Sequence, residues 1–154
     1  MMTNLNFPST TLLIDSAGDS PLVFDRVRRR YVALTPEEWV RQHLIHYLID
    51  HRDYRPSLIS VEGSVKVNRM IKRADVVCWS APEKPWLVAE CKAPTVFLSQ
   101  LVLDQALRYN TVLDARFVLI TNGLVHVCVE MPREGSPARV VQEIPLAPVL
   151  HKNV

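Results

Sequence analysis

The stretch Trp-Leu-Val-Ala-Glu-Cys-Lys at residues 86–92 is an apolar run that ends in an acid and an amine. Its composition, and the Ala-Pro pair that follows it, predict a β-strand. Side chains alternate between the two faces of a strand, so Glu90 and Lys92 should point to one face and Cys91 to the other. Because charged groups are costly to bury unless they are paired or used, the end of this strand is a candidate for chemistry.

Another charged residue interrupts the strand predicted just before it, at residues 74–79. Asp75 stands there in otherwise apolar company. If the two strands pair as a hairpin, Asp75 lies across from Glu90. Two converging carboxylates form the oxygen site that Mg²⁺ prefers, with water and a substrate phosphate completing the coordination. Lys92 would then position the attacking water or stabilise charge on the phosphoryl oxygens. The same side chains could instead form a purely structural ion-pair cluster.

The clearest local signal is the sequence Thr-Pro-Glu-Glu at residues 35–38. Threonine is a favoured N-cap, proline is favoured at the first helical position, and a glutamate three residues after the cap completes a capping box. Apolar residues then recur at helical spacing, which predicts a helix that ends near Arg52. Glu38 is expected to be the capping-box residue, and Glu37 a solvated residue favoured by the helix dipole.

Further short elements are predicted on both sides of these segments. Residues 22–34 suit a strand or an edge hairpin, and the arginines at positions 26 and 28–30 are interpreted as a solvated edge. The Ile- and Val-rich residues 58–67 predict a strand with Gly63 as a bulge or turn. Residues 95–110 have helical length and few residues that would break a helix.

Two more strands around an Asn-Gly turn are predicted at residues 116–121 and 124–131. The order of helix, three strands, helix and two strands favours an α/β fold with a mixed β-sheet flanked by helices. A chain of 154 residues suits one domain. We therefore assign residues 1–21 to an N-terminal extension, 22–131 to the domain itself, and 132–154 to a loosely structured C-terminal tail.

The composition is ordinary for a soluble globular protein. Apolar residues make up 48% and charged residues 22% of the chain, and the formal charge of +2 permits a nucleic-acid partner without demanding one. The three cysteines show no CxxC spacing and are interpreted as buried, reduced thiols in strands, which indicates an intracellular protein. Neither a signal peptide nor a membrane span is predicted, so the sequence favours a cytoplasmic location.

The spacing of the charged residues resembles the signature of the PD-(D/E)xK nucleases. Asp75 stands fifteen residues before the tripeptide Glu90-Cys91-Lys92, and Ala74 stands where the family's name has proline. The resemblance implies a restriction endonuclease-like core with Mg²⁺ held by Asp75, Glu90 and the Cys91 carbonyl. It also implies that Lys92 is the catalytic lysine, and Mn²⁺ is expected to substitute for Mg²⁺.

Two further elements narrow the resemblance. Gln105 and Tyr109 look like the QxxxY element of the RecB-like branch of this superfamily, which implies that they contact DNA or brace the metal ligands. The first predicted helix and the Thr-Asn-Gly at residues 121–123 are similar to the N-terminal nuclease domain of type I restriction enzyme R subunits. In related nucleases a glutamate of the first helix can join the metal site, and Glu38 is the candidate here.

Basic residues just before Asp75 are candidates for contact with DNA. Arg69, Lys72 and Arg73 would approach the cleft that holds the nucleic acid. The sequence contains no G-x-x-x-x-G-K phosphate loop, so ATP-driven translocation, and restriction in the type I manner, would need other subunits. The leading hypothesis is a Mg²⁺-dependent DNA endonuclease that works with restriction–modification subunits, and paired cuts across a duplex would suit a homodimer.

Two other classes of function remain open. The chain could be a nucleic-acid-binding or assembly module that keeps the nuclease fold without cleaving, which its short length and missing motor would suit. It could also be an interaction domain with a structural charge cluster, which predicts no metal affinity. No membrane partner is expected.

Overall fold

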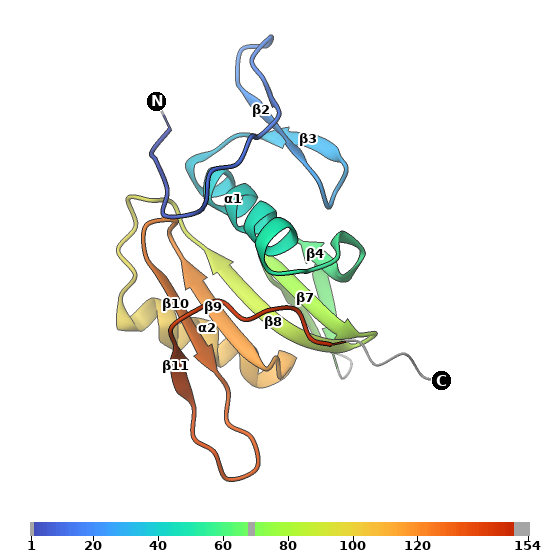
Figure 1. Ribbon diagram of the computed structural model, residues 1–154, viewed down its shortest axis with the longest axis vertical. Helices are drawn as coiled ribbons and strands as arrows, with labels where there is room; N and C mark the ends of the chain where they lie inside the picture. Colours follow the sequence, from blue (N-terminus) through green and yellow to red (C-terminus); the bar gives the residue numbers. More distant parts are fainter. Residues whose placement is uncertain (1, 68–69, 150–154) are drawn as a thin grey trace.

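A six-stranded mixed β-sheet forms the centre of the fold (Figure 1). The computed structural model describes residues 2–67 and 70–149, with the backbone alone described at 64–67 and 70–73. Strands β8 and β9 are parallel, and the other neighbours in this sheet are antiparallel, which confirms the predicted mixed sheet. Across the sheet the order is β11 (Arg139–Val141), β10 (His126–Glu130), β9 (Phe117–Thr121), β8 (Lys84–Cys91), β7 (Val76–Ala81) and β4 (Ile59–Val61).

Two helices, α1 (Pro36–His51) and α2 (Gln100–Leu113), cover opposite faces of this sheet (Figure 1). Adjacent residues of β9 divide between the two cores because side chains alternate along a strand. Leu119 belongs to the cluster beneath α1, and Val118 belongs to the cluster beneath α2. The predicted α/β class, with helices flanking the sheet, is confirmed.

Helix α1 begins and ends where the sequence predicts. The Thr35 hydroxyl accepts a hydrogen bond from the Glu38 N–H at 3.0 Å, as an N-cap should. Pro36 occupies the first turn, where its missing N–H costs nothing. At the other end the Arg52 N–H donates to the Leu48 carbonyl at 3.2 Å. Local capping chemistry therefore fixes the helix that carries part of the candidate site.

The predicted edge hairpin is confirmed and belongs to a separate three-stranded sheet. Its strands are β1 (Ile14–Asp15), β2 (Leu22–Asp25) and β3 (Arg30–Ala33). Asp25 shapes the turn between β2 and β3, because its Oδ1 accepts from the N–H groups of Val27 and Arg28 at 2.8 and 2.7 Å. This turn carries Arg28 toward the candidate site.

The Ile- and Val-rich segment at residues 58–67 forms two strands rather than one. A short 3₁₀ helix (Pro56–Leu58) leads into β4, and the chain then turns at Glu62 and Gly63. Strand β5 (Ser64–Val67) pairs with β6 (Met70–Arg73) as a separate two-stranded sheet. The turn that the sequence allowed at Gly63 thus separates two sheets.

Helix α2 begins later than predicted. We expected a helix at residues 95–110, whereas α2 begins at Gln100 and its N-cap is Ser99, whose hydroxyl accepts from the Val102 N–H at 3.4 Å. The preceding residues are held in a loop, since the Val96 N–H donates to the Ala93 carbonyl at 3.0 Å and the Asn122 side chain donates to the Val96 carbonyl at 2.9 Å. The cap signal at Ser99 is what the prediction missed.

The C-terminal segment is ordered, and the expectation of a loosely structured tail is wrong for the part the structure describes. Strand β11 pairs with β10 at the sheet edge. Beyond it, Ile144 is buried, the Tyr54 hydroxyl donates to the Pro145 carbonyl at 2.9 Å, and the Ala147 N–H donates to the Arg52 carbonyl at 2.9 Å. The prolines that suggested a loose tail still offer carbonyls, so they do not prevent docking.

The N-terminal segment packs on the turn between β9 and β10. The Asn6 N–H donates to the Gly123 carbonyl at 2.7 Å. Gly123 has φ of 85°, and a Cβ added there would lie 2.7 Å from Leu5 Cδ2. Glycine is therefore required at this position for two reasons: the positive φ of the backbone and the close approach of the Leu5 side chain.

The cysteines match the expectation from sequence, because Cys78, Cys91 and Cys128 are all buried and free. Of the helices in residues 2–67 and 70–149, none is long and apolar enough to cross a membrane.

Candidate active site

The antiparallel pairing of β7 and β8 brings the predicted acids together. Val76 pairs with Ala89, so Asp75, one residue before β7, falls opposite Glu90 at the end of β8, as the hairpin hypothesis required. Lys92 Nζ lies 3.2 Å from Glu90 Oε1, which agrees with their placement on one face. Asp75, Glu90 and Lys92 therefore gather at one end of the sheet.

Both oxygens of Asp75 have protein partners. The Cys91 N–H donates to Asp75 Oδ2 at 2.8 Å, and Arg41 Nη2 lies 3.4 Å from Asp75 Oδ1. The Cys91 thiol is buried in the core beneath α1, on the face opposite Glu90. Asp75 is thus held in a fixed orientation, and Glu90 contacts both Lys92 and Asp75.

The electrostatics of the three residues suit a cation between the carboxylates. Burial, and then the nearby Asp75, raise the pKa of Glu90 above its ordinary value despite the opposing effect of Lys92. Burial disfavours the charged form of Lys92, but Glu90, Asp75 and Glu37 outweigh it, so the pKa of Lys92 is raised. Lys92 therefore stays protonated at neutral pH, and the repulsion at Glu90 is one that a bound cation would relieve.

Glu38, the first-helix residue expected to join the metal, is instead enclosed by two arginines. Arg28 Nη2 donates to its Oε1, and Arg41 Nη1 donates to its Oε2 at 2.9 Å. The side chain is 6% exposed. Both oxygens of the Glu38 carboxylate are thus bonded to guanidinium groups. These charged partners replace the bond to the Thr35 N–H that the second half of a capping box would provide.

Glu37 is the first-helix carboxylate that faces the site. Burial and then Asp75 raise its pKa, while Arg41 and Lys92 act in the opposite direction. Its side chain is 44% exposed and its Oε1 lies 3.1 Å from Arg41 Nη2. Glu37 is therefore solvated, as the sequence predicts, and it is also close enough to Asp75 and Lys92 to be the first-helix candidate for a further acid at the site.

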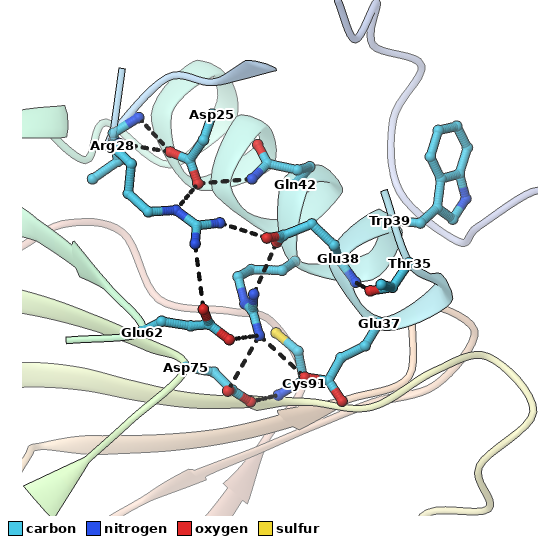
Figure 2. A network of polar contacts seen from close by, with 12 residues as sticks. Asp25, Arg28, Thr35, Glu37, Glu38, Trp39, Gln42, Glu62, Asp75 and Cys91 are labelled. Carbon is cyan, nitrogen blue, oxygen red and sulfur yellow. Dashed lines mark hydrogen bonds and ion pairs between the residues drawn. The ribbon is translucent and has the colours of Figure 1, made fainter. Parts of the chain in front are cut away.

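Two arginines that sequence reasoning did not select connect the site to the N-terminal hairpin (Figure 2). Arg28, interpreted from the sequence as part of a solvated edge, is only 12% exposed and pairs with Asp25, Glu38 and Glu62. Arg41 reaches from α1 to Asp75. The local part of these pairings could have been found from helical spacing, because Arg41 pairs with Glu37 and Glu38 at i,i+4 and i,i+3. The contacts with Glu62 and Asp75 come from segments far apart in the sequence.

Helix α2, which carries the two residues of the QxxxY resemblance, covers the face of the sheet on which Glu90 lies. Tyr109 and Glu90 line the same small cavity, of about 20 Å³, between α2 and the sheet. Gln105 lies about one turn earlier and is exposed. Arg69 lies outside the described residues, and so do the side chains of Lys72 and Arg73, so their approach to DNA stays a prediction.

The side chains at this site meet part of the requirements for binding Mg²⁺. Within the described part of the chain, no three His, Cys, Asp or Glu side chains converge closely enough to hold a metal ion by themselves. Mg²⁺, however, usually keeps several waters and is bound by one or two carboxylates plus substrate phosphate. Asp75 and Glu90 meet that requirement through hard oxygen donors, and their mutual repulsion is what such an ion would relieve.

The three residues of the site are partly exposed. A hollow of about 780 Å³ lies away from them and is lined by Trp86, Arg116 and their neighbours at the opposite end of β7 and β8. The side chains of Asp75, Glu90 and Lys92 are 18%, 37% and 31% exposed. Partial exposure of all three side chains is compatible with a long polymer substrate.

The fold and the site together define an α/β domain with a mixed sheet flanked by helices and a charged cluster at one sheet end. Residues 36–145 match the family described as type I restriction enzyme R protein N terminus, HSDR_N. The chain belongs to this family. The match includes Asp75, Glu90 and Lys92.

A solved structure shares this fold. A fragment described as an HsdR subunit of a type I restriction enzyme from Vibrio vulnificus YJ016 superposes with a TM-score of 0.52 at 22% sequence identity. The match covers 74% of this chain and 24% of that one, so this chain spans about a quarter of the fragment. Comparison with curated proteins found no match.

Proposed function

We propose that this restriction R-subunit domain is a metal-dependent DNA endonuclease whose site is formed by Asp75, Glu90 and Lys92. The observation that carries the proposal is the β7–β8 register, which sets Asp75 opposite Glu90 with Lys92 beside it. Membership of the R-subunit N-terminal family supports an endonuclease role in general terms. The restriction machinery as a whole would need further domains or subunits for its motor.

Each residue has a distinct proposed role. Asp75, Glu90 and the Cys91 carbonyl would hold Mg²⁺, or Mn²⁺ in its place. When bound, the ion polarises the phosphate and lowers the pKa of a coordinated water. Because the pKa of Lys92 is raised, its ammonium would orient the water and stabilise charge on the phosphoryl oxygens, and would not act as the base.

The remaining proposed contacts are to DNA. Gln105 and Tyr109 on α2 would contact the DNA or brace Glu90, and the shared cavity supports the second role for Tyr109. Arg69, Lys72 and Arg73 would contribute positive charge along the phosphate backbone. A homodimer would place two such sites on the two strands of a duplex.

A second candidate function is a DNA-binding or assembly module that does not cleave. The observation that favours it is the engagement of Asp75 by Arg41, together with the lack of a complete side-chain metal cluster in the described residues. Under this alternative the protein binds DNA, and no metal supports turnover.

The test compares cleavage of single- and double-stranded DNA by the purified chain with Mg²⁺ or Mn²⁺. Asp75→Asn and Lys92→Met should each reduce the rate by about 100-fold or more, because each removes a group that stabilises the transition state. Matched controls are Asp104→Asn on exposed α2 and Lys84→Met at the far end of β8, which should cleave like wild type.

Two outcomes would contradict the proposal. Cleavage that survives both site substitutions would assign the activity to another site or to a contaminant. DNA binding without turnover in any metal would favour the non-cleaving module. Calorimetric titration with Mn²⁺ distinguishes the proposed metal site from a purely structural ion-pair cluster. Such a cluster predicts that neither wild type nor Glu90→Gln binds Mn²⁺.

A further inference from the structure

Three carboxylates converge on a single nitrogen of Arg41. Its Nη2 lies 3.1 Å from Glu37 Oε1, 3.2 Å from Glu62 Oε1 and 3.4 Å from Asp75 Oδ1. Figure 2 shows the Glu37, Glu62 and Asp75 side chains meeting at this point. The Arg41 guanidinium thus supplies the positive charge that these three acids share, and the described acids around it do not themselves form a cluster that could hold a metal ion.

Arg41 is positioned to neutralise these acids and not to bind substrate. The side chain is 3% exposed, and its Nη1 donates to the buried Glu38 at 2.9 Å. A guanidinium so enclosed cannot reach a DNA phosphate without leaving four carboxylates. Burial disfavours its charge, but Glu38 and Asp75 outweigh that effect and the pKa of Arg41 is raised, so the positive charge is permanent.

Glu62 is fixed in place to complete this arrangement. Its backbone is left-handed, with φ of 47°, which is a costly conformation for a residue with a side chain. The Glu62 N–H donates to the Asp75 carbonyl at 2.9 Å, and its carboxylate contacts both Arg28 and Arg41. Glu62 is thereby tied to the arginines as well as to the backbone beside the proposed ligand.

The described residues of this network carry an excess of negative charge. The acids Asp25, Glu37, Glu38, Glu62, Asp75 and Glu90 face the cations Arg28, Arg41 and Lys92, so the formal charge is −3 when all are ionised. Two-metal nuclease sites hold ions about 3.5–4 Å apart and need acids to surround both. Here Glu37 and Glu62, the acids that a second ion would need, are engaged by Arg41.

We propose that Arg41 is the built-in second cation of this site, so that the domain binds one divalent metal ion, between Asp75 and Glu90, and not two. Arg41 is a positioning residue that acts through Asp75, and Glu62 serves Arg41 without being a metal ligand. The inference rests on the proposed metal site and specifies its stoichiometry.

The experiment titrates Mn²⁺ into the full chain by calorimetry without DNA, and follows thermal unfolding with and without Mn²⁺. Wild type should bind one Mn²⁺. Arg41→Gln should bind a second, because three acids lose their shared cation, and its melting temperature should rise more on Mn²⁺ addition than that of wild type. Arg41→Lys keeps the charge and should bind one. Arg26→Gln, which removes a partly exposed pair with Asp50, is the matched control.

Glu62→Gln tests the inference even if Arg41→Gln fails to fold, because Glu62 is 43% exposed. It should bind one Mn²⁺ with affinity within about fivefold of wild type, the scale of a surface pair. Two Mn²⁺ in wild type, or the complete loss of Mn²⁺ binding in a folded Glu62→Gln, which would make Glu62 itself a metal ligand, would overturn the inference.

The outcomes also separate this inference from the proposed function. If wild type binds no Mn²⁺ while Arg41→Gln binds one, Arg41 fills the cation position as inferred and the proposed metal site is wrong. If neither binds, both fail. If wild type binds one and a folded Arg41→Gln also binds one with unchanged affinity, the metal site stands and the role of Arg41 is refuted.

Discussion

The two helices that flank the sheet differ in how much they bury and in what they contribute. Helix α1 buries eight of its residues, including Glu38, Arg41 and Gln42, whereas α2 buries three, Ala106, Asn110 and Leu113. The α1 side thus carries both a large part of the core and the charge network that fixes Asp75. The α2 side keeps Gln105 and Tyr109 at the surface. The network that fixes Asp75 is therefore anchored on α1, whereas α2 presents exposed side chains beside the site.

The largest expected effect tests this difference in burial. Leu44 on α1 is fully buried, and Leu101 on α2 is 64% exposed. Leu44→Ala should lower the free energy of unfolding by about 2–5 kcal/mol through lost burial and a cavity. Leu101→Ala should change it by no more than about 0.5 kcal/mol. Urea denaturation measures both, and equal losses would show that α2 is as much a part of the core as α1.

A second pair of substitutions tests the anchor within the first turn of α1. Glu38→Gln should destabilise the protein by about 3 kcal/mol, because it removes the buried carboxylate that pairs with both Arg28 and Arg41. Glu37→Gln should cost about 1 kcal/mol at most, since that side chain is 44% exposed. Thermal or urea unfolding decides between them. A stable Glu38→Gln with weakened Mn²⁺ binding would restore Glu38 as the metal ligand.

The sequence was sufficient where local rules govern the structure. Alternation along a strand placed Glu90 and Lys92 together, and the short connection between two strands brought Asp75 opposite Glu90. The cap at Thr35 fixed the start of α1. Each of these conclusions depends on residues close in the chain, whose geometry is set by backbone sterics and hydrogen bonding.

The sequence was insufficient where distant segments meet. Whether Glu37 or Glu38 faces the site depends on two residues that are distant in the sequence. Arg28 lies in the N-terminal hairpin, and Glu62 follows β4. The order of the C-terminal segment depends on contacts with Tyr54, about ninety residues earlier. Such pairings are decided by tertiary packing, and no periodicity or motif in one sequence records them.

The pH dependence of the site gives a smaller effect. The pKa of Glu90 is raised in the folded protein, so the folded state holds its proton to higher pH than the unfolded state. Metal-free stability should therefore fall, and Mn²⁺ affinity should rise, as pH increases from the ordinary glutamate value of 4.5 through the raised pKa. Glu90→Gln should lose this part of both profiles. A wild-type profile identical to that of Glu90→Gln would contradict the raised pKa of Glu90.

The smallest expected effect concerns the accessible side. If DNA approaches along α2, Gln105→Ala should weaken DNA binding by about fivefold, the loss of about one hydrogen bond, without changing Mn²⁺ stoichiometry or stability. Gln100→Ala, on the same helix and bonded to Asp104 at 2.8 Å, is the matched control and should bind DNA like wild type. Fluorescence anisotropy with labelled duplex measures both. Equal binding by the two variants would place the DNA elsewhere, and the exposure of α2 would then mark only a surface that the rest of the R subunit could cover.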